Sequence, residues 1–200
     1  MGALSRPIVL QHAHRQRSAC NASPGKSREL PVQRSLIALS ACICSAIVIL
    51  DQLSKAWVRD VIPSGTLVHI AGRLHLTHIS NTGLVFGLGQ GNILFPTIAS
   101  ILVLVAIPVA IWHAHREHGY SPSLLESICF GLIAGGAIGN LIDRITFGHV
   151  TDFLLVRLFG NTFWPAFNIA DMSIVGGAIL LVATVVHRDL RHARQRTTDS

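Results

Sequence analysis

Long apolar runs alternate with short polar stretches along this chain. Four such runs, at about residues 35–57, 93–112, 124–142 and 167–186, are rich in Leu, Ile, Val and Ala. Each reaches roughly the 20 residues that a helix needs to cross a bilayer. In the third run Gly131, Gly135 and Gly139 recur every four residues, which predicts close packing of a neighbouring helix. The pattern predicts an α-helical membrane protein with four transmembrane helices.

The segment between the first two runs, about residues 58–90, has a different pattern. Residues 66–70 and 74–79 are short stretches rich in β-branched residues, separated by Ala71-Gly72-Arg73. This arrangement is typical of a β-hairpin. Asn81-Thr82-Gly83 follows as a glycine-containing turn that presents a carboxamide. We therefore expect a small β-sheet on the outer membrane face.

Positive charge gathers at the two ends of the chain. Only 13 % of the 200 residues are charged, the net charge is +6, and most Lys and Arg lie before residue 35 or after residue 187. A nucleic-acid-binding protein would carry them on a folded face, so we expect no nucleic-acid partner. An Arg-rich, acid-poor start is also typical of an organelle transit peptide, which stays an alternative interpretation of this segment.

The same charges predict how the chain is divided and oriented. We expect a disordered basic cytoplasmic extension at 1–33, a four-helix membrane domain at 34–188 and a basic cytoplasmic tail at 189–200. By the positive-inside rule, both termini are cytoplasmic and the segments 58–90 and 143–166 face the outer side.

Four aspartates are unusual in so apolar a chain, and the predicted spans place all of them towards the outer side: Asp51, Asp143, Asp152 and Asp171. A carboxylate near hydrocarbon is costly, so each needs a partner, water or a function. Asp51 has Lys55 one helical turn later, and Asp143 has Arg144 beside it, so local ion pairs can account for these two. Asp152 and Asp171 have no base close in sequence.

Two carboxylates brought together can share a proton, because repulsion and burial raise one pKa. The ionised member then takes a proton from water while the protonated member hydrogen-bonds the scissile carbonyl, which hydrolyses a peptide bond. Nucleophilic catalysis is disfavoured because the serines lack a Gly-x-Ser-x-Gly context. His69, His75 and His78 lack an acid or Cys to complete a ligand set, so we expect no metal and no cofactor. Spacing alone does not say which aspartates form the pair.

Five motifs in order carry a resemblance to a known family: Asp51-Gln52-Leu53-Ser54-Lys55, Asn81-Thr82-Gly83-Leu84-Val85-Phe86, Gly139-Asn140-Leu141-Ile142-Asp143-Arg144, Gly148-His149-Val150-Thr151-Asp152-Phe153 and Phe167-Asn168-Ile169-Ala170-Asp171. Across about residues 35–187 the chain resembles the bacterial lipoprotein signal peptidases (signal peptidase II), an aspartyl peptidase family. Leu84 and Val85 stand where that family usually has smaller residues, which affects the expected shape of the pocket.

The resemblance implies both an activity and a set of site residues. The activity is that of an intramembrane aspartyl endopeptidase of the bacterial inner membrane, active on its outer, periplasmic side. It cuts diacylglyceryl-modified prolipoproteins N-terminal to the lipidated cysteine with carboxylate-activated water, so its partners are these signal peptides and membrane lipid. The implied catalytic pair is Asp152 and Asp171. Substrate-binding and supporting roles fall on a second set of residues: Asp51, Lys55, Asn81, Gly83, Asn140, Asp143, Arg144 and Asn168.

Two other classes of protein remain open. A small transporter or proton channel could use the four aspartates as a relay, which requires acids spread through the depth of the bilayer. A purely structural membrane adaptor would leave Asp152 and Asp171 without a role.

Overall fold

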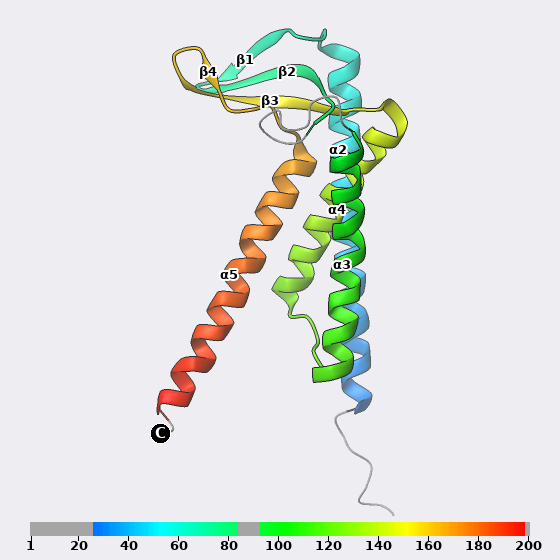
Figure 1. The fold of residues 1–200 in the computed structure, drawn as a ribbon, viewed down its shortest axis with the longest axis vertical. Coiled ribbons are helices and arrows are strands. Elements are labelled where there is room, and N and C mark those ends of the chain that lie inside the picture. Colours follow the sequence, from blue (N-terminus) through cyan, green and yellow to red (C-terminus); the bar gives the residue numbers. More distant parts are fainter. Residues whose placement is uncertain (1–25, 84–92, 199–200) are drawn as a thin grey trace, which may run out of the picture. The chain divides into compact units, whose positions relative to one another are not determined.

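The computed structural model describes residues 26–83 and 93–198 (Figure 1). The chain divides into two units, Met1–Ser35 and Leu36–Ser200. The strands and most of the helical residues belong to the second unit. Most of the expected extension at 1–33 lies outside the described residues, as do Leu84 and Val85, so the expected change in pocket shape stays a prediction.

Four helices account for the four apolar runs: α2 (Lys26–Val61), α3 (Leu94–His118), α4 (Leu124–Phe147) and α5 (Ile169–Thr198). Each contains a stretch long and apolar enough to cross a membrane, which confirms the expected class of fold. The helices run beyond the apolar runs. α2 begins at Lys26, before the expected domain start at 34, and α5 continues to Thr198 through the expected tail. Once a helix has formed, each further residue adds a backbone hydrogen bond, so polar ends can extend it.

α4 is the central helix. Of its most apolar stretch, 56 % is buried inside the protein, against 11 % or less for the other three helices. The predicted glycine stripe contacts α2. A Cβ atom at Gly131 would come within 2.8 Å of the Ser40 carbonyl oxygen, and one at Gly135 would come within 2.8 Å of Ile47 Cβ. Larger side chains would hold the two helices apart.

A small antiparallel sheet contains β1 (Leu67–Ala71), β2 (Leu74–Asn81), β3 (Val150–Phe159) and β4 (Thr162–Phe163), in that order. In Figure 1 it lies at the end of the helices where α2 finishes and α5 begins. β1 and β2 are the predicted hairpin. β3 was not predicted, although its run of β-branched and aromatic residues is typical of a strand. It pairs Asp152 with Ile79 and Val150 with Asn81.

The sheet is attached to the helices by a small apolar cluster and by the backbone. Val58 of α2 and Ile62, just after this helix, pack with Phe153 of β3. The Phe167 carbonyl oxygen, just before α5, accepts hydrogen bonds from the N–H groups of Phe153 at 3.1 Å and Leu154 at 2.8 Å. The strand that carries Asp152 is therefore joined to the start of the helix that carries Asp171.

Candidate active site

Asp171 lies in the first turn of α5 and forms a reciprocal cap with Asn168. The Asp171 N–H donates to Asn168 Oδ1 at 2.9 Å, and the Asn168 N–H donates to Asp171 Oδ2 at 3.2 Å. This is the geometry of a capping box, which satisfies two free N–H groups at a helix start. The cap fixes the Asp171 carboxyl group, and the positive end of the helix dipole favours negative charge there.

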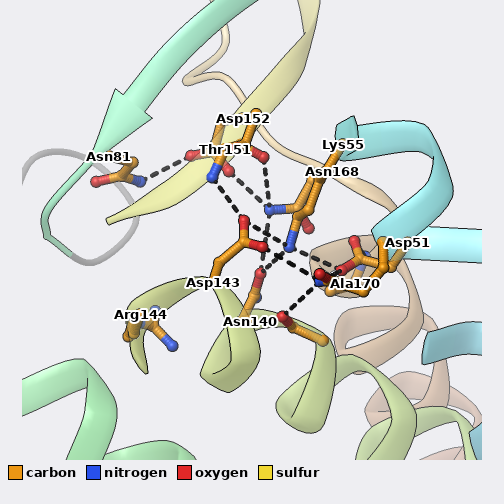
Figure 2. Close-up of polar contacts among 12 residues, drawn as sticks. Asp51, Lys55, Asn81, Asn140, Asp143, Arg144, Thr151, Asp152, Asn168 and Ala170 are labelled. Atoms are coloured by element: carbon orange, nitrogen blue, oxygen red, sulfur yellow. Dashed lines mark hydrogen bonds and ion pairs between the residues drawn. The ribbon is translucent and has the colours of Figure 1, made fainter. Parts of the chain in front are cut away.

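Asp152 lies on β3 and is 2 % exposed. Its carboxyl oxygens accept hydrogen bonds from Asn81 Nδ2 at 2.8 Å and Asn168 Nδ2 at 2.7 Å (Figure 2). Burial, followed by the negative charge of Asp171, raises the pKa of Asp152 to about 7. The hydrogen bonds act in the opposite direction but do not offset this rise. Asp152 therefore gains and loses its proton near neutral pH.

Two carboxamides connect these aspartates. Asn140 of α4 donates from Nδ2 to Asp171 Oδ1 at 2.8 Å, and its Oδ1 accepts from Asn168 Nδ2 at 3.1 Å. Asn168 in turn contacts both Asp152 and Asp171. The structure thus brings together residues from α4, α5, β2 and β3 that are far apart in sequence.

Asp51, Lys55 and Asp143 form a buried ion cluster next to the carboxamides. Lys55 Nζ lies 2.8 Å from Asp51 Oδ2 and 3.4 Å from Asp143 Oδ2, and all three side chains are 0 % exposed. The ion pair expected between Asp51 and Lys55 is present.

The local pair expected between Asp143 and Arg144 was wrong. Adjacent residues of a helix point in different directions. Asp143 faces Lys55 of α2, whereas Arg144 Nη1 donates to Ser100 Oγ of α3 at 3.2 Å.

Several contacts at the site involve residues to which the sequence assigned no role. Gln52 Nε2 lies 3.2 Å from oxygens of both Asp51 and Asp143. Arg59 Nη1 donates to Thr151 Oγ1 at 2.9 Å. The sequence could have indicated Arg59, because it follows Lys55 by four residues and so shares a face of α2 with it.

A cavity of about 630 Å³ opens beside the two carboxyl groups. Asp152, Asp171 and Arg144 line it, together with Asn81 and Gly83, whose N–H donates to Asn81 Oδ1 at 2.9 Å. The remaining wall is largely apolar and comes mainly from α3, α5 and the segment before α5, including Val103, Trp164, Met172 and Val175. A water molecule and an extended, partly apolar ligand could meet the two aspartates there.

Hydrogen bonds join the four aspartates into one cluster. A relay across the membrane would instead require them to be spread along the helices. Within residues 26–83 and 93–198, no group of three or more His, Cys, Asp or Glu side chains is arranged to hold a metal ion.

Comparison with known proteins gives a consistent result. A family model described as signal peptidase (SPase) II matches residues 43–187. The lipoprotein signal peptidase of Syntrophomonas wolfei subsp. wolfei is 41 % identical over 149 residues, which cover 74 % of this chain and 93 % of that protein. The lipoprotein signal peptidase of Chlorobaculum tepidum is 36 % identical over 155 residues, covering 73 % and 93 %.

Solved structures agree with these relatives. A bacterial membrane enzyme determined by the in meso method at 2.3 Å matches with a TM-score of 0.64 and 30 % identity, over 74 % of this chain and 87 % of that one. A second, at 1.9 Å, matches with a TM-score of 0.61 and 30 % identity, over 73 % and 91 %. Because the family model matches well over half of the sequence, the chain belongs to the signal peptidase II family.

Proposed function

We propose that the protein is a lipoprotein signal peptidase that hydrolyses the peptide bond before the diacylglyceryl-modified cysteine of a prolipoprotein, with Asp152 and Asp171 as the catalytic pair. The observation that carries the assignment of this pair is that both carboxyl groups line one cavity and are joined through Asn168. The relatives named lipoprotein signal peptidase support the substrate.

Hydrolysis by this pair needs one proton shared between two carboxyl groups. The pKa of Asp152, raised to about 7, makes a singly protonated pair abundant near neutral pH. The ionised carboxylate takes a proton from water, whose oxygen bonds to the scissile carbonyl carbon. The protonated carboxyl donates to the carbonyl oxygen and stabilises the charge that develops there.

Collapse of the resulting tetrahedral intermediate breaks the carbon–nitrogen bond. The proton taken from water goes to the leaving amine, and the signal peptide departs with a new carboxylate, so one water is consumed for each bond broken. Asn140 and Asn168 contribute by holding both carboxyl groups in fixed orientations, which lowers the reorganisation needed at the transition state.

The wall of the cavity supports recognition of a lipid-modified substrate. Val103 of α3 and Met172 and Val175 of α5 are apolar and line the same cavity as the catalytic pair. Acyl chains from the bilayer can be buried against such a surface by the hydrophobic effect. Membrane lipid would therefore border the bound substrate.

The expected location is the bacterial inner membrane, with both termini in the cytoplasm and the catalytic pair near the outer, periplasmic face. The basic residues at the two ends of the chain support this orientation through the positive-inside rule. The sheet and the aspartate cluster, at the opposite helix ends, would then meet substrates after export.

A pair of matched peptides tests this proposal. Detergent-purified protein is given a prolipoprotein peptide with and without the diacylglyceryl group, and the products are identified by mass spectrometry. We expect a single cut before the cysteine, much faster for the modified peptide, and no cut by Asp171→Asn. Equal cleavage of both peptides would contradict lipid recognition, and cleavage by folded Asp171→Asn would contradict the assigned pair.

A further inference from the structure

Next to the proposed catalytic pair lies a second pair of aspartates, Asp51 and Asp143, on α2 and α4. We propose that these two, joined by Lys55, are positioning residues that set the separation of the catalytic carboxyl groups. The inference rests on the proposed function, because it assumes that Asp152 and Asp171 perform the reaction.

The first support comes from two backbone hydrogen bonds. Asp143 Oδ2 accepts from the Thr151 N–H at 2.9 Å, and Asp51 Oδ1 accepts from the Ala170 N–H at 3.0 Å (Figure 2). Thr151 immediately precedes Asp152, and Ala170 immediately precedes Asp171. Each member of the second pair therefore holds the backbone N–H of the residue that precedes one member of the catalytic pair.

The second support is that side chains from one turn of α2 connect the carboxylates of Asp51 and Asp143. Lys55 Nζ lies 2.8 Å from Asp51 and 3.4 Å from Asp143, and it also donates to Asn140 Oδ1 at 2.9 Å. Gln52 Nε2 lies 3.2 Å from both carboxylates. The two carboxylates therefore share their donors and cannot move independently.

Burial makes this connection stiff. Asp51, Lys55 and Asp143 are all 0 % exposed, so water does not screen their charges. Gly139 of α4 leaves the space that the Asp51 carboxylate occupies, because a Cβ atom there would lie 2.6 Å from Asp51 Oδ2. If Lys55 lost its charge, two buried carboxylates would face each other without their shared cation and would move apart.

The other charged groups around this cluster do not replace Lys55. Arg59 Nη1 is 3.7 Å from Asp143 Oδ1 and is the nearest alternative cation, but it lies on the Thr151 side and is 23 % exposed. Arg144 is hydrogen-bonded to Ser100 of α3. Lys55 is thus the cation that touches both carboxylates.

The inference is tested with Lys55→Met, which keeps an unbranched side chain of nearly the same length and removes its charge. We expect kcat per folded molecule to fall about 100-fold, the loss that a displacement of about 1 Å can cause, with KM little changed. The double variant Lys55→Met/Asp51→Asn should regain about tenfold of this loss. It removes the unpaired charge at position 51, while the Asn oxygen can still accept from the Ala170 N–H.

A matched control is Arg188→Met, which breaks the 3.0 Å ion pair with Glu126 between α5 and the first turn of α4. Both residues lie outside the proposed site, so kcat should stay at the wild-type value even if thermal stability falls. A cluster that only stabilised the fold would give the same result for Lys55→Met: fewer folded molecules with unchanged kcat.

The outcomes separate the two proposals. Wild-type kcat in folded Lys55→Met, or a double variant no faster than the single one, would overturn the positioning role alone. If Lys55→Met does not fold, Asp51→Asn replaces it, with a loss of about tenfold expected and wild-type kcat as the contrary result. Failure of the wild type to cut the modified peptide, or cleavage by Asp171→Asn, would instead overturn the proposed function.

Discussion

Asp152→Asn should make the protein more stable at alkaline pH, although it should abolish activity. The Asp152 carboxyl has its pKa raised from 3.8 to about 7 in the folded protein. In the unfolded chain it ionises near 3.8, so ionisation favours unfolding increasingly between about pH 4 and pH 7. The cost to folding is absent below pH 4 and complete above pH 7. Asn carries no titrating proton, so the variant escapes this cost.

The size of the effect follows from the shift. A change of one pKa unit corresponds to about 1.4 kcal/mol, so a rise of about three units corresponds to about 4 kcal/mol above pH 7. The new amide must also fit the donors Asn81 and Asn168, both of which point N–H groups at this side chain. That mismatch lowers the stability of the variant by a roughly constant amount at every pH. The prediction therefore concerns how the difference in stability between Asp152→Asn and the wild type changes with pH.

Thermal unfolding in detergent measures this change in stability directly. It is followed between pH 4.5 and pH 8, about the range over which the Asp152 carboxyl changes its charge. Tm of Asp152→Asn minus that of the wild type should increase with pH up to about pH 7 and level off above it. Asp60→Asn serves as the control, because Asp60 is exposed at the end of α2, and its difference should stay flat. A difference for Asp152→Asn that is constant with pH, or that falls, would refute the reasoning about burial and the Asp171 charge.

Three further predictions concern packing, an arginine and the rate. Gly135→Ala should lower the stability measured by thermal unfolding by about 1–3 kcal/mol, because its Cβ would lie 2.8 Å from a neighbouring Cβ. The control Gly176→Ala should leave stability unchanged, because a Cβ there would have nothing within 4 Å. Ser100→Ala should lower kcat/KM about tenfold by releasing Arg144, and a Ser100→Thr variant with equally low activity would argue against the hydrogen bond. Wild-type kcat should fall above about pH 7, as the pair loses its shared proton; a rate still rising at pH 9 (about two units beyond) would contradict this.

The elements that depend on local pattern were predicted from the sequence. Hydrophobic runs of bilayer length predict the four helices, and the spacing of Gly131 and Gly135 predicts close packing of a neighbouring helix, which the structure identifies as α2. The hairpin followed from β-branched residues around Ala71-Gly72-Arg73. β3 was not predicted, because residues 153–156 form a continuous apolar run without the alternation that indicates a half-buried strand.

Apart from Lys55, which lies one turn after Asp51 on the same helix, most partners of the aspartates could not be predicted, since they come from other elements of the fold. Asp143 was expected to pair with Arg144, but it lies against Lys55 of α2. Sequence spacing showed that Asp152 and Asp171 have no base nearby, but it did not say which aspartates form the catalytic pair. In the described part of the chain, the ion pairs of Lys55 go to Asp51 and Asp143, whereas Asp152 and Asp171 accept only from carboxamides and backbone N–H groups. This difference depends on the packing of α2 against α4 and cannot be seen in the chain order.

The central claim is that Asp152 and Asp171 act as one unit, and a double-mutant cycle on kcat tests it most directly. Single-turnover cleavage of the modified peptide is measured for Asp152→Asn, Asp171→Asn and the double variant, each checked for folding. We expect each single variant to lose about 1,000-fold or more in rate and the double variant to lose no more than either, because general acid and base steps in one pair fail together. Substantial activity in either single variant, or losses that multiply in the double variant, would contradict the account.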